Sequence, residues 1–409
     1  MDTKLLLLIF FFSFASNCFA KERTYYIAAD EVVWDYAPTN MDGATGMYLN
    51  ETTNSSSSMM NESPATWTQN GPSRIGKQYK KVLYREYTDS SFATLKNRTS
   101  EWEHLGYLGP VIRAEVGDTI KVVFRNNGQN PYSMHPHGVL YDKQNEGVPN
   151  DSDMKQTNVT DGNRVMPGME WTYTWKVPER SGPSPEDPSS IIWMYHSHVD
   201  EVMDVNSGLV GPIVITRSGA AESSGKAKDV DREFVLMYTI IDENLSWYLD
   251  ENMMTYLPDF NQSNMETLKM DEDFQMSNMK HSVNGYLFSN LPGLSMMVNE
   301  KVRWYVISIG NEKDLHGTHW HGQTLLYDGH QVDVIELIPA SMKTLDMRPD
   351  NPGEWMVHCH TNHHISAGMI AMFDVMPSDM SSSSSATGIF PFKIQIAIIL
   401  CFIFLFFMH

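Results

Sequence analysis

The chain carries the same two histidine motifs twice, and this internal repeat constrains its fold more than any other feature. Residues 133–138 match residues 317–322, and each segment contains a His-X-His pair followed by glycine. Residues 193–198 match residues 355–360, and each segment ends in a second His-X-His pair. Similar segments in the same order indicate repeated structural units, so we expect two domains of one kind.

Alternation of apolar and polar residues predicts strands, whereas long helical periodicity is scarce. Residues 171–177 interleave Trp, Tyr and Val with Thr and Lys, and residues 302–307 alternate in the same way. Three further segments have strand character, namely residues 119–124, 233–241 and 369–375. Gly, Pro and Asn separate these segments. Short strands with frequent turns are typical of antiparallel sandwiches, so we predict an all-β chain with two Greek-key β-sandwich domains.

The repeat and the local composition also predict a domain organisation. We expect a signal peptide at residues 1–20, a first domain at 21–217, a linker at 218–231, a second domain at 232–377 and a C-terminal segment at 378–409. The linker is rich in Gly, Ala, Ser and charged residues, as linkers often are. A polar stretch at about residues 40–71 carries three glycosylation sequons, and we expect it to form an exposed, glycosylated insertion in the first domain.

Both ends of the chain have the character of targeting segments. Lys4, an apolar run and a terminal small residue make residues 1–20 a secretory signal. Residues 378–409 join a Ser-rich spacer to an apolar tail, which is typical of a GPI-anchor signal. The clean apolar run at residues 394–408 is shorter than the ~20 residues that a transmembrane helix needs. We expect attachment to the outer face of the plasma membrane, with secretion or a transmembrane anchor as alternatives.

Glycosylation sequons and charge agree with an extracellular location. The Asn-X-Ser/Thr sequons, which mark acceptor sites in secreted proteins, are Asn50, Asn54, Asn61, Asn97, Asn150, Asn158, Asn244 and Asn261. The formal net charge is −20, so the surface would attract cations and would repel nucleic acid. We therefore expect a glycoprotein without a nucleic-acid partner.

One cysteine remains once the two end segments are set aside, and it has the neighbours of a metal ligand. Cys359 lies between His358 and His360, and His364 and Met369 follow within ten residues. A free thiol enclosed by imidazoles in a secreted protein is expected to bind a metal. Thiolate, imidazole and a weak thioether form the ligand set of a blue-copper electron-transfer centre.

Strand geometry places these ligands on two opposite faces. Residues two apart on a strand point to the same side, so His358 and His360 share one face and Cys359 points to the other, into the core. The four His-X-His pairs supply eight imidazoles, a number that suits a cluster of three coppers. Zinc suits the pattern less well, because structural zinc sites use closed sets of four ligands.

The two copies of the repeat differ at the blue-copper positions. Where the second domain has ligand residues, the first domain has Tyr132, Ser197 and Leu209. These three residues cannot replace imidazole, thiolate and thioether as copper ligands. We therefore expect the first domain to keep both His-X-His pairs and to lack a blue-copper centre.

These motifs resemble those of the multicopper oxidases, and three segments are similar to the ceruloplasmin and hephaestin group, namely residues 195–215, 242–256 and 281–296. The resemblance covers most of residues 21–377. It implies cupredoxin-type domains and a copper cofactor of four ions per functional unit, one of type 1, one of type 2 and two of type 3. It also implies that electrons from a reductant reduce dioxygen to water.

The resemblance further implies a role for each ligand residue. The type 1 copper would be bound by His316, Cys359, His364 and Met369. The type 2 copper would be bound by His135 and His319. The type 3 coppers would be bound by His137, His196, His198, His321, His358 and His360. Electrons would enter near His316 or His364 and pass through Cys359 to His358 and His360.

The number of domains departs from the ceruloplasmin pattern and bears on assembly. Relatives of the ceruloplasmin kind have six such domains, whereas this chain has two. Half of the cluster ligands lie in each domain, so the two His-X-His faces must meet. By the same resemblance, we expect a cyclic homotrimer in which each cluster is shared between neighbouring chains.

The copper ligands do not determine which reductant the protein oxidises. Ferroxidase relatives hold Fe(II) with Glu, His, Asp and Glu, and the matching residues here are Met276, His281, His363 and Glu312. Thioether and imidazole favour Cu(I) over Fe(II). We favour a ferroxidase on the family likeness, with a Cu(I) oxidase or a laccase-like oxidase of phenols and aromatic amines as alternatives. A copper-binding carrier or adhesion protein without turnover is the non-enzymatic alternative.

Overall fold

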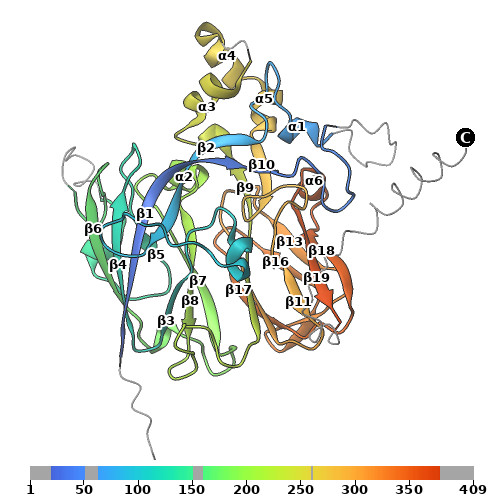
Figure 1. The fold of residues 1–409 in the computed structure, drawn as a ribbon. Coiled ribbons are helices and arrows are strands. Elements are labelled where there is room, and N and C mark those ends of the chain that lie inside the picture. Colours follow the sequence, from blue (N-terminus) through green and yellow to red (C-terminus); the bar gives the residue numbers. More distant parts are fainter. Residues whose placement is uncertain (1–19, 51–62, 151–159, 259–260, 378–409) are drawn as a thin grey trace, which may run out of the picture.

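A computed structural model describes residues 20–50, 63–150, 160–258 and 261–377. Strands dominate these residues, and Figure 1 shows the sheets of the first domain, in blue and green, beside those of the second domain, in yellow to red. Each domain contributes two sheets. The prediction of an all-β chain with two β-sandwich domains is therefore confirmed.

The first domain pairs two four-stranded sheets. One sheet has the order β2 (Gln78–Tyr87), β1 (Glu22–Asp35), β4 (Thr119–Asn126) and β6 (Glu170–Lys176). The other has the order β3 (Ile112–Glu115), β8 (Val210–Thr216), β7 (Ser190–His196) and β5 (His135–Pro136). The core between them contains aromatic residues such as Tyr84, Phe124 and Trp175.

The second domain pairs a six-stranded and a five-stranded sheet. The larger sheet has the order β10 (Met279–Val283), β9 (Arg232–Asp242), β12 (Val302–Ser308), β17 (Met342–Met347), β14 (Leu325–Tyr327) and β15 (His330–Val332). The smaller has the order β11 (Ser295–Met297), β19 (Ile370–Met376), β18 (Gly353–Cys359), β13 (His316–Trp320) and β16 (Val334–Leu337).

Parallel strand pairs occur in both domains beside the antiparallel pairs that the sequence indicated. Strand β1 pairs with β4 and β3 with β8, while β9 pairs with β12 and β11 with β19. Parallel neighbours need a crossover connection. Each such connection passes through the other sheet of the domain. Between β1 and β4, for example, the chain forms β3 in the other sheet. Alternation in a sequence does not reveal this, because it is the same in either strand direction.

Strands β6 and β12 show why one alternating pattern can give two burial patterns. In β6, Tyr173 and Trp175 are buried and the Thr and Lys residues between them are exposed. In β12, every residue is buried. Trp304 packs in the core of the second domain, whereas Tyr305 packs in a core that both domains share. The larger sheet of the second domain is therefore covered on both faces.

A buried polar network joins the domains beside this shared core. Arg113 of the first domain forms an ion pair with Glu233 at an Nη2–Oε2 distance of 2.8 Å. Tyr305 donates to Glu233 at 2.7 Å, and Arg303, which is fully buried, donates to Ser190 at 2.7 Å. Because unpaired buried charges are costly, these contacts fix how the two domains sit against each other.

Helices are short and lie mainly in connections. The α-helices are α1 (Ala65–Thr68), α2 (Glu201–Ser207), α3 (Leu249–Tyr256), α4 (Met265–Lys269), α5 (Glu272–Ser277) and α6 (Asn362–Ser366). The 3₁₀ turns are η1 (Ser100–Leu105), η2 (Lys143–Asn145), η3 (Glu179–Ser181), η4 (Glu243–Leu245) and η5 (Gln262–Asn264). Figure 1 shows α3, α4 and α5 gathered with α1 at one end of the molecule.

The predicted linker consists of turns, whereas part of the predicted insertion is buried. Residues 218–231 form turns, with a bridge between Ala221 and Ala227. The insertion was predicted to be exposed, and this is wrong for α1, where Thr66, Trp67 and Thr68 are buried. Local composition is polar there, but Trp67 packs against the second domain.

Several predictions about the ends of the chain lie outside the described residues. These are the signal peptide apart from residue 20, the GPI-anchor signal and the sequons Asn54, Asn61 and Asn158. Across the described segments, no helix combines the length and the apolar character that crossing a membrane requires.

Candidate metal centres

Three buried ligand atoms converge at the end of β18. Cys359 Sγ lies 3.5 Å from His364 Nδ1 and 3.7 Å from His316 Nδ1, and the two Nδ1 atoms are 3.2 Å apart. His316 begins β13 and His364 lies in α6, so three elements form the site. Cys359 is fully buried, and both imidazoles are nearly so. The group can hold a metal ion with one sulfur and two nitrogen ligands.

The site favours the thiolate form of Cys359. Burial opposes ionisation, but hydrogen bonds with His316 and His364 overcome it and lower the pKa of Cys359 to about 5. Thiolate rather than thiol is the form that binds metals. The sulfur is therefore a ligand that is already charged at neutral pH.

Met369 lies in the connection between α6 and β19, next to Cys359 in the fold. Its side chain is fully buried and packs in one core with Cys359. The backbone N–H of Cys359 donates to the carbonyl of Met369 at 3.1 Å, and Met369 N–H donates to the carbonyl of His364 at 2.9 Å. The backbone thus places Met369 beside both Cys359 and His364.

Asp314 holds the outer edge of His316. His316 Nε2 lies 3.3 Å from Asp314 Oδ1, and both side chains are fully buried. Burial alone would lower the pKa of His316, but Asp314 and Cys359 together raise it. Carboxylates that bond to the far nitrogen of a ligand imidazole fix its orientation.

The second domain presents a set of four imidazoles on the other face of β18. His319 pairs with His358 across β13 and β18. His321 Nε2 lies 2.9 Å from His358 Nε2, and the His319 ring centroid is 4.6 Å from that of His321 and 5.3 Å from that of His360. We call these residues the second histidine set, namely His319, His321, His358 and His360.

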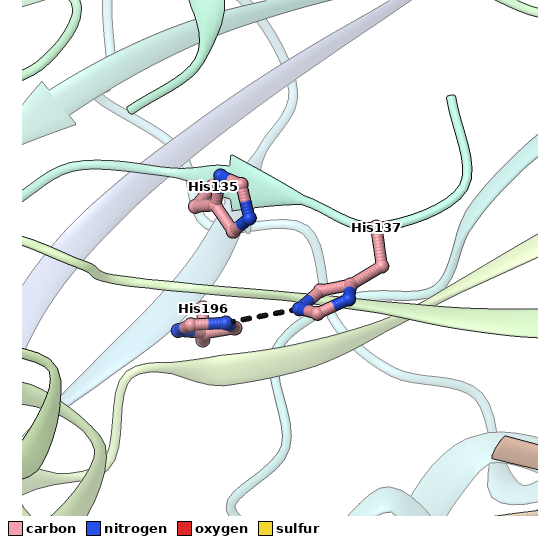
Figure 2. Close-up of side chains that lie close together, drawn as sticks. All are labelled: His135, His137 and His196. Atoms are coloured by element: carbon pink, nitrogen blue, oxygen red, sulfur yellow. Dashed lines mark hydrogen bonds between the residues drawn. The ribbon is translucent and has the colours of Figure 1, made fainter. Parts of the chain in front are cut away.

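The first domain presents an equivalent set. His135 pairs with His196 across β5 and β7, and Figure 2 shows the rings of His135, His137 and His196 turned toward one another. His137 Nε2 lies 3.1 Å from His196 Nε2, and the His198 ring centroid is 5.3 Å from that of His135. We call these residues the first histidine set, namely His135, His137, His196 and His198.

The protonation of both sets fits copper binding. The Nδ1 atoms of His135, His196 and His358 lie 2.7, 3.1 and 2.8 Å from backbone carbonyl oxygens, so Nδ1 carries the proton and Nε2 is left as a ligand. Burial, and secondarily the neighbouring imidazoles, lower the pKa of His137 to about 4 and of His196 to about 3. Neutral imidazole is the form that binds copper.

The two histidine sets are separate within one chain. In the described part of the chain, every ring contact between two of these eight histidines joins members of the same set. Each histidine set, which is one predicted half of the cluster, is therefore assembled within its own domain. The described residues of one chain show no contact between the rings of the two sets.

The predicted substrate-metal residues are brought together only in part. His281 is buried, and its ring centroid is 5.0 Å from that of His363 and 5.2 Å from that of His364. Met276 is half-buried on α5, which adjoins β10, and Glu312 is exposed before β13. The imidazoles thus form a contiguous group beside the thiolate site.

Sequence reasoning missed three residues at these sites. Trp67 lies 6.3 Å, between ring centroids, from both His281 and His363, and nothing in its local sequence indicated this. Asp204 accepts a hydrogen bond from Ser197 at 2.6 Å. Asp314 stands two residues before His316, and that spacing was the available signal.

Comparisons with known proteins agree with this geometry. Two sequence profiles described as "Multicopper oxidase" match residues 98–219 and 258–379. Ferroxidase HEPHL1 of Mus musculus is 41% identical over 357 residues, which cover 87% of this chain and 29% of that protein. Ceruloplasmin of Homo sapiens is 40% identical over 384 residues, which cover 93% of this chain and 34% of that protein.

A solved structure shows the same fold. The chain is similar to a structure titled "Multicopper Oxidase mgLAC", with a TM-score of 0.53, 18% identity and coverage of 91% of this chain and 90% of that one. The chain therefore belongs to the multicopper oxidase family. It spans 29% and 34% of the two curated relatives named above, so it corresponds to a part of their length.

Proposed function

We propose that this chain is an extracellular oxidase that couples four one-electron oxidations of Fe(II) to the four-electron reduction of dioxygen, with four protons, to two water molecules. The observation that carries the proposal is the strand β18, which turns Cys359 toward one ligand group and His358 toward another. Relatives named as ferroxidases support Fe(II) as the reductant. Copper, when bound, would supply the one-electron redox chemistry and the dioxygen-reducing centre.

We assign the ligands by their place in the two domains. His316, Cys359, His364 and Met369 would hold the type 1 copper, and His135 and His319 would hold the type 2 copper. The type 3 coppers would be held by His137, His196, His198, His321, His358 and His360. The convergence of Cys359 with His316 and His364, and the grouping of each histidine set, support this assignment.

The protein itself supplies three things to this chemistry. Burial of Cys359 excludes water from the thiolate, and the lowered pKa keeps that thiolate charged. Carbonyl acceptors hold His196 and His358 with Nε2 directed into the sets. Peptide bonds join Cys359 to His358 and His360 directly, which gives a short covalent route between the two groups of ligands.

We further propose that neighbouring chains complete the cluster in a cyclic homotrimer. Each chain presents two separate sets of four imidazoles, and a neighbour would bring the missing four. Apolar residues exposed near each set support a contact surface: Val202 follows the first set, and Val334 pairs with His319 of the second. Light scattering tests this, because a monomer that carries a full copper complement would contradict it.

We propose attachment to the outer face of the plasma membrane by a GPI anchor, and release of the protein from cells by a phosphatidylinositol-specific phospholipase would support it. Among the sequons, Asn97 is exposed and suits a glycan. The Asn244 amide nitrogen donates to Asp242 and Gln275, which argues against modification there.

The contact between His281 and His363 favours Cu(I) oxidation as a second candidate. The imidazole His363 stands where ferroxidase relatives have a carboxylate, and it lies next to His281 and His364. Imidazole suits Cu(I) better than Fe(II). Dioxygen uptake with Fe(II), Cu(I) and an aromatic amine would separate ferroxidase, Cu(I) oxidase and laccase-like activity.

A substitution at α5 makes this comparison sharper. Met276→Glu would restore an oxygen ligand, so the Cu(I)/Fe(II) rate ratio should fall. An unchanged ratio would count against Met276 as part of the substrate site. No dioxygen uptake with any reductant, in protein with its full copper complement, would favour the copper carrier instead.

A further inference from the structure

The first domain contains a polar group at the position that the thiolate site occupies in the second. Ser197 lies between His196 and His198, as Cys359 lies between His358 and His360. Ser197 N–H donates to the carbonyl of Leu209 at 3.1 Å, and Cys359 N–H donates to that of Met369 at the same distance. The two strand ends thus have matching backbone contacts and different side chains.

Asp204 stands beside Ser197 as His364 stands beside Cys359. Ser197 Oγ donates to Asp204 Oδ2 at 2.6 Å, and both residues are fully buried. The backbone N–H groups of Val199 and Asp200 donate to the same oxygen at 3.1 Å. Trp247 Nε1 donates to Asp204 Oδ1 at 2.9 Å. Four donors therefore hold this carboxylate rigidly.

The hydrogen bonds continue from Asp204 to the histidine-bearing strands. Ser197 Oγ accepts from Ser133 N–H at 3.1 Å, and His198 N–H donates to Ser133 Oγ at 3.1 Å. Ser133 Oγ in turn donates to the carbonyl of Gly147 at 2.6 Å. These bonds join the end of β7 to the segment that enters β5, so they connect both His-X-His pairs of the first set.

In the second domain the matching histidine N–H bonds to a carbonyl and not to a side chain. His360 N–H donates directly to the carbonyl of Gly317 at 2.7 Å, and Gly317 matches Ser133 in the repeat. This contact of the second set is therefore a direct backbone bond beside the thiolate site. The matching contact of the first set runs through the side chains of Ser133, Ser197 and Asp204.

We propose that Asp204 is a positioning residue for the first histidine set, and that it acts through Ser197 and Ser133. In the second domain, the thiolate site fixes the end of β18, which carries two ligand imidazoles. In the first domain, this hydrogen-bond network fixes the end of β7 in the same way. The inference rests on the proposed function, because it concerns copper at the histidine sets. It assigns no ligand role to Asp204 itself.

The test measures copper at the two kinds of centre separately. Copper per chain, the visible absorption of thiolate-bound copper and the EPR signal of copper without a thiolate ligand are compared in Asp204→Ala, Ser197→Ala and the unsubstituted protein. We expect both variants to keep the visible absorption, which reports on the second domain. We expect copper retention at the histidine sets to weaken about 10–100-fold, as for other residues that orient metal ligands.

Two further variants separate positioning from stability. Asp204→Asn keeps an oxygen that accepts from Ser197, so it should restore part of the EPR signal. Asp118→Ala is the matched control, because Asp118 is also a buried carboxylate of the first domain, bonded to Arg23 and to Glu115 N–H, and contacts no histidine of the set. It should lower stability and leave both copper signals intact.

The results of these experiments separate a failure of the positioning role of Asp204 from a failure of the proposed function. If Ser197→Ala and Asp204→Asn both retain a wild-type EPR signal and full copper, Asp204 does not position the set, whether or not Asp204→Ala folds. If Asp118→Ala loses the signal equally, the role is merely structural. If the unsubstituted protein lacks the visible absorption and the EPR signal, the proposed function fails instead.

Discussion

His316 Nε2 lies 3.3 Å from Asp314 Oδ1, with both side chains fully buried, while His316 Nδ1 faces the sulfur of Cys359. Asp314 is itself held, because its two oxygens accept from the backbone N–H groups of Ile240 and Asn311 at 2.7 and 2.9 Å. His364, the other imidazole beside the sulfur, is in ring contact with His281 instead. The two imidazoles beside the sulfur therefore have different surroundings.

We expect Asp314→Asn to weaken copper binding at the thiolate site by about 10–100-fold, because His316 would lose its charged partner. Competition with a chelator, followed through the visible absorption, measures this. Asp118→Asn serves as the control, since Asp118 is a buried carboxylate distant in the sequence from Cys359. Equal chelator sensitivity in the two variants would show that Asp314 does not strengthen copper binding through His316.

The stability of the metal-free protein should depend on Cys359. The pKa of this thiol is lowered from 9.0 to about 5 on folding. Between these values the unfolded chain binds a proton that the folded chain does not. The stabilisation is thus fully present above pH 9 and is lost as the pH falls toward 5. Urea unfolding of the protein and of Cys359→Ser should therefore diverge as the pH rises from 5 to 9; parallel pH profiles would contradict the lowered pKa.

The first histidine set should make the metal-free protein sensitive to acid. Burial, and then the neighbouring imidazoles, hold the pKa of His196 at about 3, against an ordinary 6.5. Below pH 6.5 the unfolded state gains the proton first, so stability falls by up to about 1.4 kcal/mol per pH unit for this group. We expect His196→Gln to flatten the profile between pH 4 and 6.5 in denaturant titrations. A slope as steep as that of the unsubstituted protein would contradict the burial argument.

Met369 should set the potential of the thiolate centre. Removing a weak axial thioether leaves the oxidised copper less well stabilised, so Met369→Leu should raise the reduction potential. Redox titration of the visible absorption gives the midpoint, and Met376→Leu, a partly exposed methionine of the same region, is the control. A midpoint that Met369→Leu leaves unchanged would remove Met369 from the ligand set.

Strand geometry made the two faces of β18 predictable from the sequence. The alternation of His358, Cys359 and His360 fixes opposite directions for thiolate and imidazole, whatever surrounds the strand. The internal repeat similarly predicted that each His-X-His pair would have a partner pair. The structure places Cys359 in the core of the second domain and His358 next to His321, in line with that pattern.

Contacts between distant segments were beyond the same reasoning. Trp67 reaches His281 from more than two hundred positions away in the sequence, out of a stretch whose composition is polar. Asp204 and His364 hold equivalent places in the two domains, but they follow Ser197 and Cys359 at different spacings. Comparison of the two repeats therefore did not align Asp204 with His364. Burial of both faces of β12 depends on the packing of the first domain, which alternation does not encode.

In our proposal, one strand joins a thiolate copper site to histidine sets that bind further copper. Metal analysis with visible and EPR spectroscopy on the purified, fully metallated protein tests it most directly. The account predicts four coppers per functional unit, intense visible absorption that Cys359→Ser abolishes, and a separate EPR signal from copper without a thiolate ligand. Colourless protein, or protein whose colour survives Cys359→Ser, would contradict it.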